Sequence, residues 1–579
     1  MNNRSQARSG QNIRINESVV APLRQPAVEF TEDNAILNVG RRSSVAAPDE
    51  GNTGVLATGN NVNISNRGNI SGALNGISSL GNNFTLRNNR NATISSNSRA
   101  VDLTDGDNIT VSNRGDILGT GNQRNGTFYV DGTVDNLNLL NQRNGTIDAG
   151  AGNIGDGFSV QVGAEEDSTN ENINISNRGT IAGRGQAEFS PEEGRLTANG
   201  SSGVRFFNGL DAGEATVTGT FNNTGTISSE VNVGFLGGYV VEDGVSYQGQ
   251  IRNLGSISGP RNGLYIGNAE HQLEINNQRR GLIESGSRAV NLDGDNVIFN
   301  NNGSVVGTGD QRDGTLYVDG TGDNIDINNG RSGRIDAGVG NNGSGVSIQV
   351  GTAGGLSDGG DDLETSADLV NSGLIQGRGT ENVPPGVRLF VGSGLDASTF
   401  TGNITNNRSG VIASEQDAGI LIEDNVTFNG QITNKGTIRG GNGLAIDASG
   451  ALGDITVVNA RRGNLQGAVV LGEGNDTLLN SNNNGLNITG GGGNDDLTGG
   501  SGTNIYSFDL GSGQDIIRDY QSGRDILDLG SYFGGDATQA LGATTQVGHD
   551  ALIDLGNDNS ITLANVDATA LTTESFSFG

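Results

Sequence analysis

Residues 66–70 read NRGNI, and close copies of this five-residue phrase recur along the chain. The clearest copies are NRGDI (113–117), NRGTI (177–181), NTGTI (223–227), NLGSI (253–257), NSGLI (371–375) and NKGTI (434–438). A short phrase that is repeated many times indicates one small structural unit stacked on copies of itself. The sequence therefore predicts an all-β protein built as a long parallel β-helix, or β-solenoid.

Each copy of the phrase combines a turn and a strand. Asn and Gly adopt positive φ at low cost, so we expect Asn-x-Gly to form a tight corner. The residues that follow, as in GTISS at 225–229, alternate between apolar and polar, which is typical of a strand with one buried face. The spacing from Ile70 to Ile94 to Ile117 fits one coil per copy. A unit this small gains its stability from stacked neighbours.

Composition supports a thin core and excludes some partners. The chain has 579 residues, of which 98 are Gly, and only 4% are aromatic, whereas a globular enzyme normally has more large apolar side chains. Disordered chains share this composition, but the regular spacing of Ile, Val and Leu favours a solenoid. The formal net charge of −31 argues against nucleic acid as a partner, and the absence of Cys excludes disulfides.

The ends of the chain and the duplication suggest four regions. Residues 1–50 contain no copy of the phrase, and we expect an N-terminal arm in which Thr31–Val39 forms a capping or donor strand. Its first residues lack the apolar run of a cleaved signal peptide, and no stretch reaches the ~20 apolar residues of a membrane span. Residues 51–470 are predicted to form the β-helix, with an internal duplication over about 83–260 and 271–440. Residues 471–517 and 518–579 form two further regions.

The duplication repeats several polar residues. GTFYVDGT at 126–133 matches GTLYVDGT at 314–321, and SVQVG at 159–163 matches SIQVG at 347–351. Either these blocks hold a repeated ligand site or the residues stabilise the corners, and we favour the second interpretation. The acidic loops Ala164–Asn172 and Ser357–Asp368 either bind Ca²⁺ weakly or are solvated insertions, which we prefer. The repeated polar pairs are Tyr129 and Tyr317, Asp131 and Asp319, and Asp148 and Asp336.

The region after residue 470 contains a sharper motif. GGGGNDDLT at 490–498 fits the nonapeptide G-G-x-G-x-D-x-U-x, where U is a large apolar residue, and LGEGNDTLL at 471–479 fits all but its first Gly. GGSGTNIYS at 499–507 has Asn504 in the Asp position, and LGSGQDII at 510–517 is a weaker copy with Asp515. In such turns the glycines expose backbone carbonyls, the Asp supplies a carboxylate and the U residue fills the core. Oxygen ligands of this kind suit Ca²⁺.

These residues resemble the RTX family of calcium-binding β-roll proteins, which bacteria export by type I secretion. The resemblance covers about residues 471–579. It implies a short Ca²⁺-binding RTX β-roll at 471–517, followed at 518–579 by a β-rich cap that carries the secretion signal. It also implies export to the cell surface or the medium without a cleaved N-terminal signal. The calcium ligands implied by the motif are Gly472, Gly474, Asp476, Gly491, Gly493, Asp495, Asn504 and Asp515.

An enzyme has to be weighed, because secreted β-helices include polysaccharide lyases and epimerases. The chain has only two His residues, His271 and His549, and we expect both at the surface. Tyr129, Asp131 and Arg143 are candidates for a saccharide site, but nothing in the sequence orders them. We therefore expect no enzyme.

The predicted function is that of a secreted, calcium-binding structural surface protein, a rigid rod in a surface layer, filament or extracellular matrix. The N-x-G-x-I body is similar in style to bacterial β-helix adhesins and autotransporter passengers. A carbohydrate- or cell-binding adhesin is accordingly the alternative, and a polysaccharide lyase or epimerase is the less favoured one. The expected partners are copies of the chain itself and a cell-surface polysaccharide.

Overall fold

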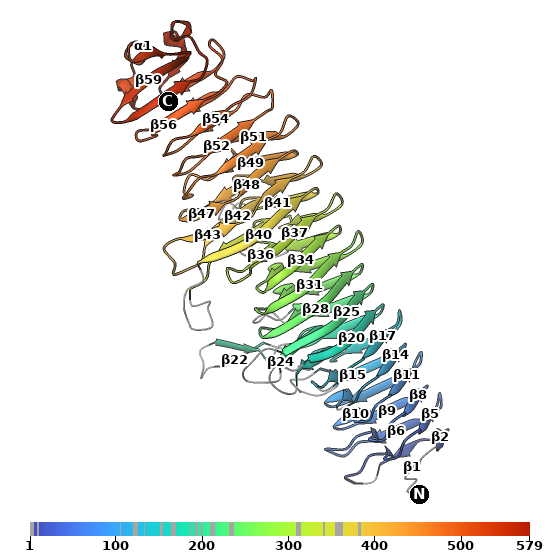
Figure 1. The fold of residues 1–579 in the computed structure, drawn as a ribbon. Helices are drawn as coiled ribbons and strands as arrows, with labels where there is room; N and C mark the ends of the chain where they lie inside the picture. The colour runs from blue at the N-terminus through green and yellow to red at the C-terminus, as the bar shows by residue number, and fades with distance from the viewer. Residues whose placement is uncertain are drawn as a thin grey trace. The chain divides into compact units, whose positions relative to one another are not determined.

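The computed structural model shows an all-β protein made of short parallel strands stacked coil upon coil, as predicted (Figure 1). The chain divides into two units, Met1–Ile298 and Phe299–Gly579, with the boundary inside β34 (Asp295–Asn301). The structure describes all residues except 1–4, 8–10, 22, 105, 120–125, 133, 151–154, 164–168, 186, 191–194, 199–200, 209–214, 231–236, 308–313, 340–341, 354–362 and 380–383.

In the first unit each full coil contributes one strand to each of three parallel ladders. The first ladder contains β2 (Asn12–Ile15), β5 (Ile36–Val39), β8 (Asn63–Asn66), β11 (Thr85–Asn88), β14 (Thr110–Asn113), β17 (Asn138–Asn141), β20 (Thr169–Asn177), β25 (Ala215–Asn223), β28 (Val245–Asn253) and β31 (Glu270–Asn277). The second contains β3 (Val19–Val20), β6 (Ser44–Ala47), β9 (Asn69–Gly72), β12 (Thr93–Ser96), β15 (Asp116–Gly119), β18 (Thr146–Asp148), β21 (Thr180–Gly183), β26 (Thr226–Ser229), β29 (Ser256–Gly259) and β32 (Leu282–Ser285).

The third ladder joins the second in one sheet. It contains β1 (Ser5–Ala7), β4 (Val28–Phe30), β7 (Val55–Ala57), β10 (Asn75–Ser79), β13 (Arg99–Leu103), β16 (Phe128–Val130), β19 (Phe158–Val162), β24 (Val204–Asn208), β27 (Gly237–Val241), β30 (Asn262–Ile266) and β33 (Arg288–Leu292). An antiparallel hairpin, β22 (Ala187–Ser190) and β23 (Arg195–Ala198), is inserted within one coil, between β21 and β24.

The coils of the first unit begin earlier than the sequence suggested. Residues 1–50 were expected to form an arm with one capping strand, but residues 12–47 already contribute stacked strands. β5 pairs in parallel with both β2 and β8, and β6 pairs with β9. These early coils lack the Asn-x-Gly-x-Ile phrase and use Val and Ala on the buried face instead, which hid them from a search for the phrase.

The apolar residue of each phrase faces the interior and stacks on its counterpart in the next coil, as predicted. In the first unit Ile70 pairs with Ile94, and Ile94 pairs with Ile117. All three are fully buried. Because successive side chains of a strand alternate between faces, one inward residue in every two is enough to build this core.

The Asn of the phrase stands at the corner, as predicted, but its side chain also joins the coils. It ends a first-ladder strand with its side chain buried, and its Nδ2 donates to Oδ1 of the corresponding Asn in the next coil over 2.8–3.0 Å. We call this column the asparagine ladder. Its members in the first unit are Asn66, Asn88, Asn113, Asn141, Asn177, Asn223, Asn253 and Asn277.

Close packing, and not positive φ, accounts for the Gly of the phrase. Neither this Gly nor the ladder Asn adopts positive φ. A Cβ on Gly179 would lie 2.1 Å from the carbonyl oxygen of Gly145, and one on Gly225 would lie 2.1 Å from that of Gly179. The corner is present, but the expectation of positive φ there is wrong, because close packing against the preceding coil is what excludes a side chain. Positive φ occurs instead just before the first-ladder strands, at residues such as Asn61 and Asn83.

The second unit repeats this arrangement. Its first ladder contains β37 (Ile325–Asn329), β40 (Glu364–Asn371), β44 (Ile404–Asn406), β48 (Gln431–Asn434), β50 (Thr456–Asn459), β52 (Thr477–Asn480), β54 (Asp496–Thr498) and β56 (Gln514–Ile517), with β43 (Ser398–Thr401) and β47 (Val426–Asn429) beside it. Its second contains β35 (Ser304–Gly307), β38 (Arg334–Asp336), β41 (Leu374–Gly377), β45 (Val411–Ser414), β49 (Thr437–Asp447), β51 (Asn464–Val470), β53 (Asn487–Thr489), β55 (Ile505–Ser507), β57 (Ile526–Asp528) and β61 (Phe576–Ser577). Its third contains β36 (Leu316–Val318), β39 (Val346–Val350), β42 (Val387–Val391) and β46 (Ile420–Ile422).

The coils of the second unit become simpler toward the C-terminus. The long strand β49 pairs with both β45 and β46, so the second and third ladders merge in it. After β51 each coil consists of two strands, such as β52 with β53 and β54 with β55. The shorter coils fit the closer spacing of the glycine-rich motifs in this region.

A small cap closes the described C-terminal end. The antiparallel strands β58 (Thr544–Val547), β59 (Asp550–Gly556) and β60 (Asn559–Leu563) pack beside the short helix α1 (Ala537–Gly542), and β60 pairs in parallel with β56. Three 3-10 turns complete it, namely η1 (Tyr532–Gly535), η2 (Ala568–Ala570) and η3 (Thr573–Ser575). Within the described part of the chain, no helix has the length and apolarity needed to cross a bilayer.

Candidate functional site: a buried aspartate column

Three aspartates predicted as calcium ligands form one column in the two-stranded coils. Asp476 precedes β52 and Asp495 precedes β54, and the two strands pair so that Thr477 lies beside Asp496. The next coil places Asp515 at the same position in β56. The 19 residues between the first two motifs, against ~18 in an ideal coil, therefore do not disturb the register.

The aspartate column is buried and is held by backbone N–H groups of the preceding coils. The three side chains are at most 2% exposed. Asp495 Oδ1 accepts from Asp476 N at 2.8 Å, and Asp515 Oδ1 accepts from Asp495 N at 3.0 Å. Asp476 Oδ1 accepts from Ile455 N at 2.6 Å. Each carboxylate thus joins two coils through one of its oxygens.

The second carboxylate oxygens are less well satisfied. Asp476 Oδ2 accepts from Gly472 N at 3.1 Å, but Asp495 Oδ2 and Asp515 Oδ2 are buried and accept no hydrogen bond from any described residue. A buried carboxylate oxygen without a partner is costly, and a cation or a proton relieves that cost. The column therefore contains two oxygens with free acceptor capacity in a row of like charges.

Burial raises the pKa of all three carboxyls. Burial raises the pKa of Asp495 to about 8, with further contributions from the charges of Asp515, Asp476 and Asp454. Burial raises the pKa of Asp515 to about 7, and burial with the charge of Asp454 raises that of Asp476 to about 6. Near neutral pH, protons or a cation are therefore needed to neutralise the negative charge of the column.

The motif glycines have the backbone geometry that the motif requires. Gly491 and Gly493 have φ of 97° and 104°, which side-chain-bearing residues rarely adopt. A Cβ on Gly491 would lie 2.0 Å from the carbonyl oxygen of Gly472, and one on Gly493 would lie 1.9 Å from that of Gly474. The predicted positions Gly472, Gly474, Gly491 and Gly493 thus stack coil on coil beside the aspartates.

Asn504 lies in a second column, separate from the three aspartates. It precedes β55, where its Oδ1 accepts from Leu486 N at 3.1 Å and its N–H donates to Asp525 Oδ1 at 2.9 Å. Burial raises the pKa of Asp525. The sequence reading missed Asp525, although the Gly523-x-Asp525 spacing before an apolar residue carries the signal. Asp519 was also missed, and it accepts from the backbone N–H groups of Gly499 and Gly500.

The donor set fits Ca²⁺ in part. Two buried carboxylate oxygens with spare acceptor capacity and the nearby glycine carbonyls are hard oxygen ligands of the type Ca²⁺ prefers. However, Gly472 O already accepts from Gly492 N at 3.0 Å. No three His, Cys, Asp or Glu side chains within the described ranges are close enough to hold a metal by themselves. A cation here would therefore need carbonyl or water oxygens as well.

The repeated polar residues of the duplication have partners within the fold. Asp148 accepts two hydrogen bonds from Arg184, at 2.9 and 2.8 Å, and Asp336 pairs in the same way with Arg378. The guanidinium beside each carboxylate keeps the pKa of Asp148 and Asp336 low despite burial. These contacts support the interpretation of the repeated residues as structural.

The candidate saccharide residues are not brought together as a set. Tyr129 donates to Gln161 Oε1 at 2.5 Å and lies 3.4 Å from Asp131 Oδ2, while Tyr317 donates to Gln349 Oε1 at 2.6 Å. Arg143 lies in the exposed turn after β17 and has no described contact with Tyr129 or Asp131. The acidic loops fall largely outside the described residues, at 164–168 and 354–362.

The expected surface position of His271 is wrong. Its side chain is fully buried in β31, where Nδ1 accepts from Tyr247 N at 3.0 Å and Nε2 lies 2.9 Å from Gly267 O. Burial lowers the pKa of His271. The polar residues around it in EHQLEINN concealed that it occupies an inward position of the strand. His549 is exposed, as expected.

No family model matches the chain, and a search of curated proteins finds no significant match.

Proposed function

We propose that this chain is a secreted, calcium-stabilised structural protein of a bacterial cell surface, filament or extracellular matrix. The observation that carries this proposal is the aspartate column, in which Asp476, Asp495 and Asp515 are stacked in the interior with raised pKa values. A divalent cation would neutralise the column at extracellular pH and calcium levels. Inside a cell, where free calcium is scarce, the same coils would remain destabilised, which suits export before folding.

The RTX resemblance and export by type I secretion are part of this proposal. The coils that carry the motifs are two-stranded and lie directly before the C-terminal cap. In this reading Asp476, Asp495 and Asp515 would supply carboxylates, and the turns at Gly472, Gly474, Gly491 and Gly493 would supply carbonyls. Asn504 belongs to the separate column with Asp525, which we propose as a weaker site. The role is structural and not catalytic, because the repeated polar residues are engaged in ion pairs and hydrogen bonds within the fold.

The first prediction tests the aspartate column with Asp495→Asn. We expect the native protein at pH 8 to be stabilised by Ca²⁺, by about 2.7 kcal/mol at a hundredfold excess over Kd. In Asp495→Asn the stabilisation should fall sharply, since one ligand carboxylate is lost. In EGTA the variant should be at least as stable as the native chain, because an amide relieves the repulsion. Urea unfolding with and without Ca²⁺ measures both effects.

The matched control for this experiment is Asp509→Asn. Asp509 is an exposed carboxylate in the same coils but outside the column. Its replacement removes the same charge and should leave the calcium response unchanged. An Asp495→Asn protein that responds to Ca²⁺ as strongly as Asp509→Asn would refute the proposed site.

A further inference from the structure

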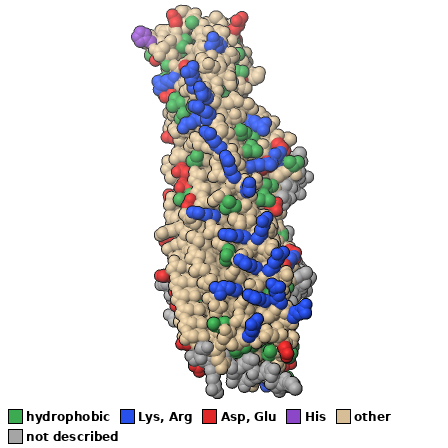
Figure 2. All heavy atoms as spheres, turned by 90° about the vertical axis from the view of Figure 1, so that its right-hand side faces the viewer, with side chains coloured by type: hydrophobic (Ala, Val, Ile, Leu, Met, Phe, Trp, Pro, Cys, Tyr) green, Lys and Arg blue, Asp and Glu red, His purple; other side chains and the backbone are tan. Residues whose placement is uncertain are grey.

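A strongly basic edge runs along each unit of this otherwise acidic protein. It consists of the turns that join first-ladder strands to second-ladder strands between β5 and β51, and we call it the basic edge. Figure 2 shows Lys and Arg side chains gathered in rows along the coils. The basic residues of these turns are Arg41, Arg42, Arg67, Arg90, Arg114, Arg143, Arg178, Arg279 and Arg280 in the first unit, and Arg331, Arg408, Lys435, Arg461 and Arg462 in the second.

The basic edge has no acidic residue to balance it. None of these turns between β5 and β51 contains Asp or Glu, although acidic residues outnumber basic ones by 65 to 34 in the whole chain. Turns of the same kind beyond this range do, with Glu17 between β2 and β3 and Asp519 and Asp525 between β56 and β57. All fourteen basic residues, nine in the first unit and five in the second, are exposed. None of them forms an ion pair with a described residue. Elsewhere in the fold, by contrast, arginines such as Arg184 and Arg378 are paired with carboxylates.

The stacking of coils turns these residues into a linear array. In the first unit six successive turns, from the one after β5 to the one after β20, each carry at least one Arg. Neighbouring strands lie about 4.8 Å apart, so these six turns place charge along about 24 Å. Like charges on adjacent strands destabilise a sheet. An unneutralised row of this length therefore indicates a partner of opposite charge and extended shape.

Two hollows on this side of the coils carry both cations and hydrogen-bonding groups. In the second unit a hollow of about 410 Å³ lies entirely within the basic edge and is lined by Arg331, Arg408, Lys435, Ser372, Asn407 and Ser409. Asn407 Nδ2 donates to Ser372 Oγ at 3.0 Å, and Ser409 Oγ donates to Ser372 O at 2.8 Å. Hydroxyl and amide groups are thus fixed between three cations.

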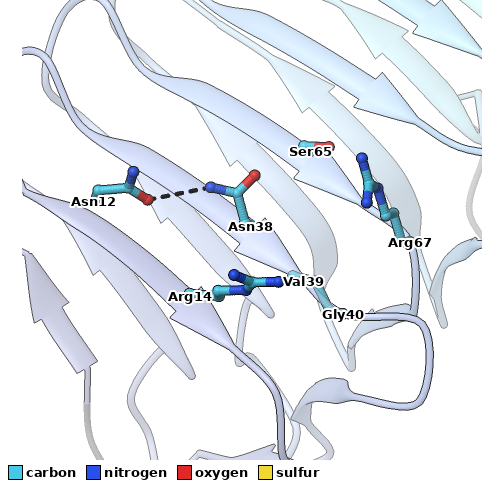
Figure 3. Close-up of a pocket in the computed structure, with 7 residues that line it drawn as sticks. All are labelled: Asn12, Arg14, Asn38, Val39, Gly40, Ser65 and Arg67. Atoms are coloured by element: carbon cyan, nitrogen blue, oxygen red, sulfur yellow. Dashed lines mark hydrogen bonds between the residues drawn. The ribbon is translucent and has the colours of Figure 1, made fainter.

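The hollow in the first unit begins at the basic edge and extends over the outer face of the first ladder. It has a volume of about 250 Å³, and its cations are Arg14 and Arg67. Figure 3 shows Asn12, Arg14, Asn38 and Ser65 on neighbouring strands, with Asn38 Nδ2 donating to Asn12 Oδ1 at 3.1 Å. Both hollows therefore combine positive charge with neutral polar groups.

We propose that the basic edge binds a linear acidic polysaccharide, one whose sugar units carry carboxylates. A guanidinium pairs with a carboxylate through two parallel hydrogen bonds, and Ser and Asn side chains suit sugar hydroxyls. The strand spacing of about 4.8 Å is close to the length of one extended sugar unit, so successive acidic sugars can meet successive coils. This proposal goes beyond the structural role above and is independent of calcium in the aspartate column.

Nucleic acid fits this surface less well. Single-stranded nucleic acids are held by aromatic side chains on which the bases stack, and neither hollow contains an aromatic residue. The turns of the basic edge contain none either. The net charge of −31 acts mainly at longer range, because charges are screened beyond about 8 Å at physiological ionic strength. A ligand lying against the edge meets chiefly the local positive charge.

The experiment measures binding of the full-length protein to polygalacturonate in EGTA, so that calcium cannot bridge carboxylates. We expect binding that weakens as salt increases, and no binding of a neutral glucan of matched length. In the variant Arg331→Gln/Arg408→Gln/Lys435→Gln, affinity should fall by roughly tenfold, because three exposed charge contacts are lost from a multivalent site. Isothermal titration calorimetry measures the affinity, and thermal unfolding verifies that the variant is folded.

The control replaces three exposed arginines outside the basic edge, in Arg24→Gln/Arg261→Gln/Arg439→Gln. It changes the net charge equally and should keep the native affinity. The proposal is overturned if polygalacturonate fails to bind, if both triple variants lose affinity equally, or if a single-stranded polynucleotide binds more tightly than polygalacturonate. It is also overturned if sedimentation shows that the native chain self-associates and the edge variant does not, since the edge would then bind a second copy. None of these outcomes depends on the calcium response of Asp495→Asn.

Discussion

A single residue type, asparagine, joins the coils from within. Asn177 shows how completely its groups are used: Nδ2 donates to Asn223 Oδ1 and to Thr226 O, while Oδ1 accepts from Asn141 Nδ2 and Gly179 N. Buried amides are favourable only when they are satisfied in this way, and a chain of such bonds polarises its members. The same side chain that would destabilise an ordinary core therefore fixes the register of this one.

Asn177→Ala tests the asparagine ladder at the residue scale. The change removes four hydrogen bonds and leaves the amides of Asn141 and Asn223 partly unsatisfied in the interior. We expect the free energy of unfolding to fall by about 2–4 kcal/mol, measured by urea denaturation. Ser176→Ala, on the outward face of the same strand, should cost less than ~0.5 kcal/mol. Equal effects of the two substitutions would contradict the proposed role of the ladder.

At the scale of the element, the two-stranded coils after β51 bury a stack of three carboxyl groups. Asp476, Asp495 and Asp515 hold protons in the folded state at a pH where the unfolded chain is ionised, because their pKa values are raised above the ordinary value of 3.8. Unfolding therefore releases protons. By linkage, stability without a cation is greatest in acid and is lost as pH rises through the folded-state pKa values.

We predict that, in EGTA, stability of these coils decreases from about pH 5 to about pH 9, following folded-state pKa values of about 6, 7 and 8. Excess Ca²⁺ should restore stability at pH 8 and have little effect at pH 5, where protons compete for the same carboxylates. Urea unfolding followed by circular dichroism across this pH range measures the slope. The double variant Asp495→Asn/Asp515→Asn should flatten it. A stability that rises with pH in EGTA would exclude the stacked carboxylates as its cause.

At the scale of the whole molecule, much of the fold follows from the sequence because the inward Ile and the phrase spacing repeat. The phrase predicted the parallel coils, and the nonapeptide brought Asp476, Asp495 and Asp515 into one column. The corner at Asn-x-Gly was predicted correctly, but the reason for its Asn and Gly was not, because positive-φ preference and coil-to-coil packing favour the same residue types. The coils before residue 51 were missed because they lack the phrase. The burial of His271 was missed because the polar residues around it hid the alternation of buried and exposed positions. The basic edge was missed because it emerges only when the turns are stacked.

The two units should differ in how calcium affects them. We predict that in EGTA at pH 8, amide protons in residues 471–528 exchange faster than in Ca²⁺, because the aspartate column is then unbalanced. Residues 57–119, whose coils are joined by the asparagine ladder and contain no such column, should exchange equally in both conditions. Hydrogen–deuterium exchange with mass spectrometry resolves these segments. Faster exchange throughout both units would show that the calcium effect is not local to the column.

The asparagine ladder also bears on how such a chain grows over generations. The sequence separation of successive members in the first unit varies from 22 to 46 residues, yet the bond between them stays at 2.8–3.0 Å. Each coil therefore presents the same hydrogen-bonding Asn to the next coil, whatever the length of the loop between them. A duplicated gene segment that encodes whole coils can be inserted without breaking an interior contact. The protein can therefore change in length by whole coils while its cross-section stays the same.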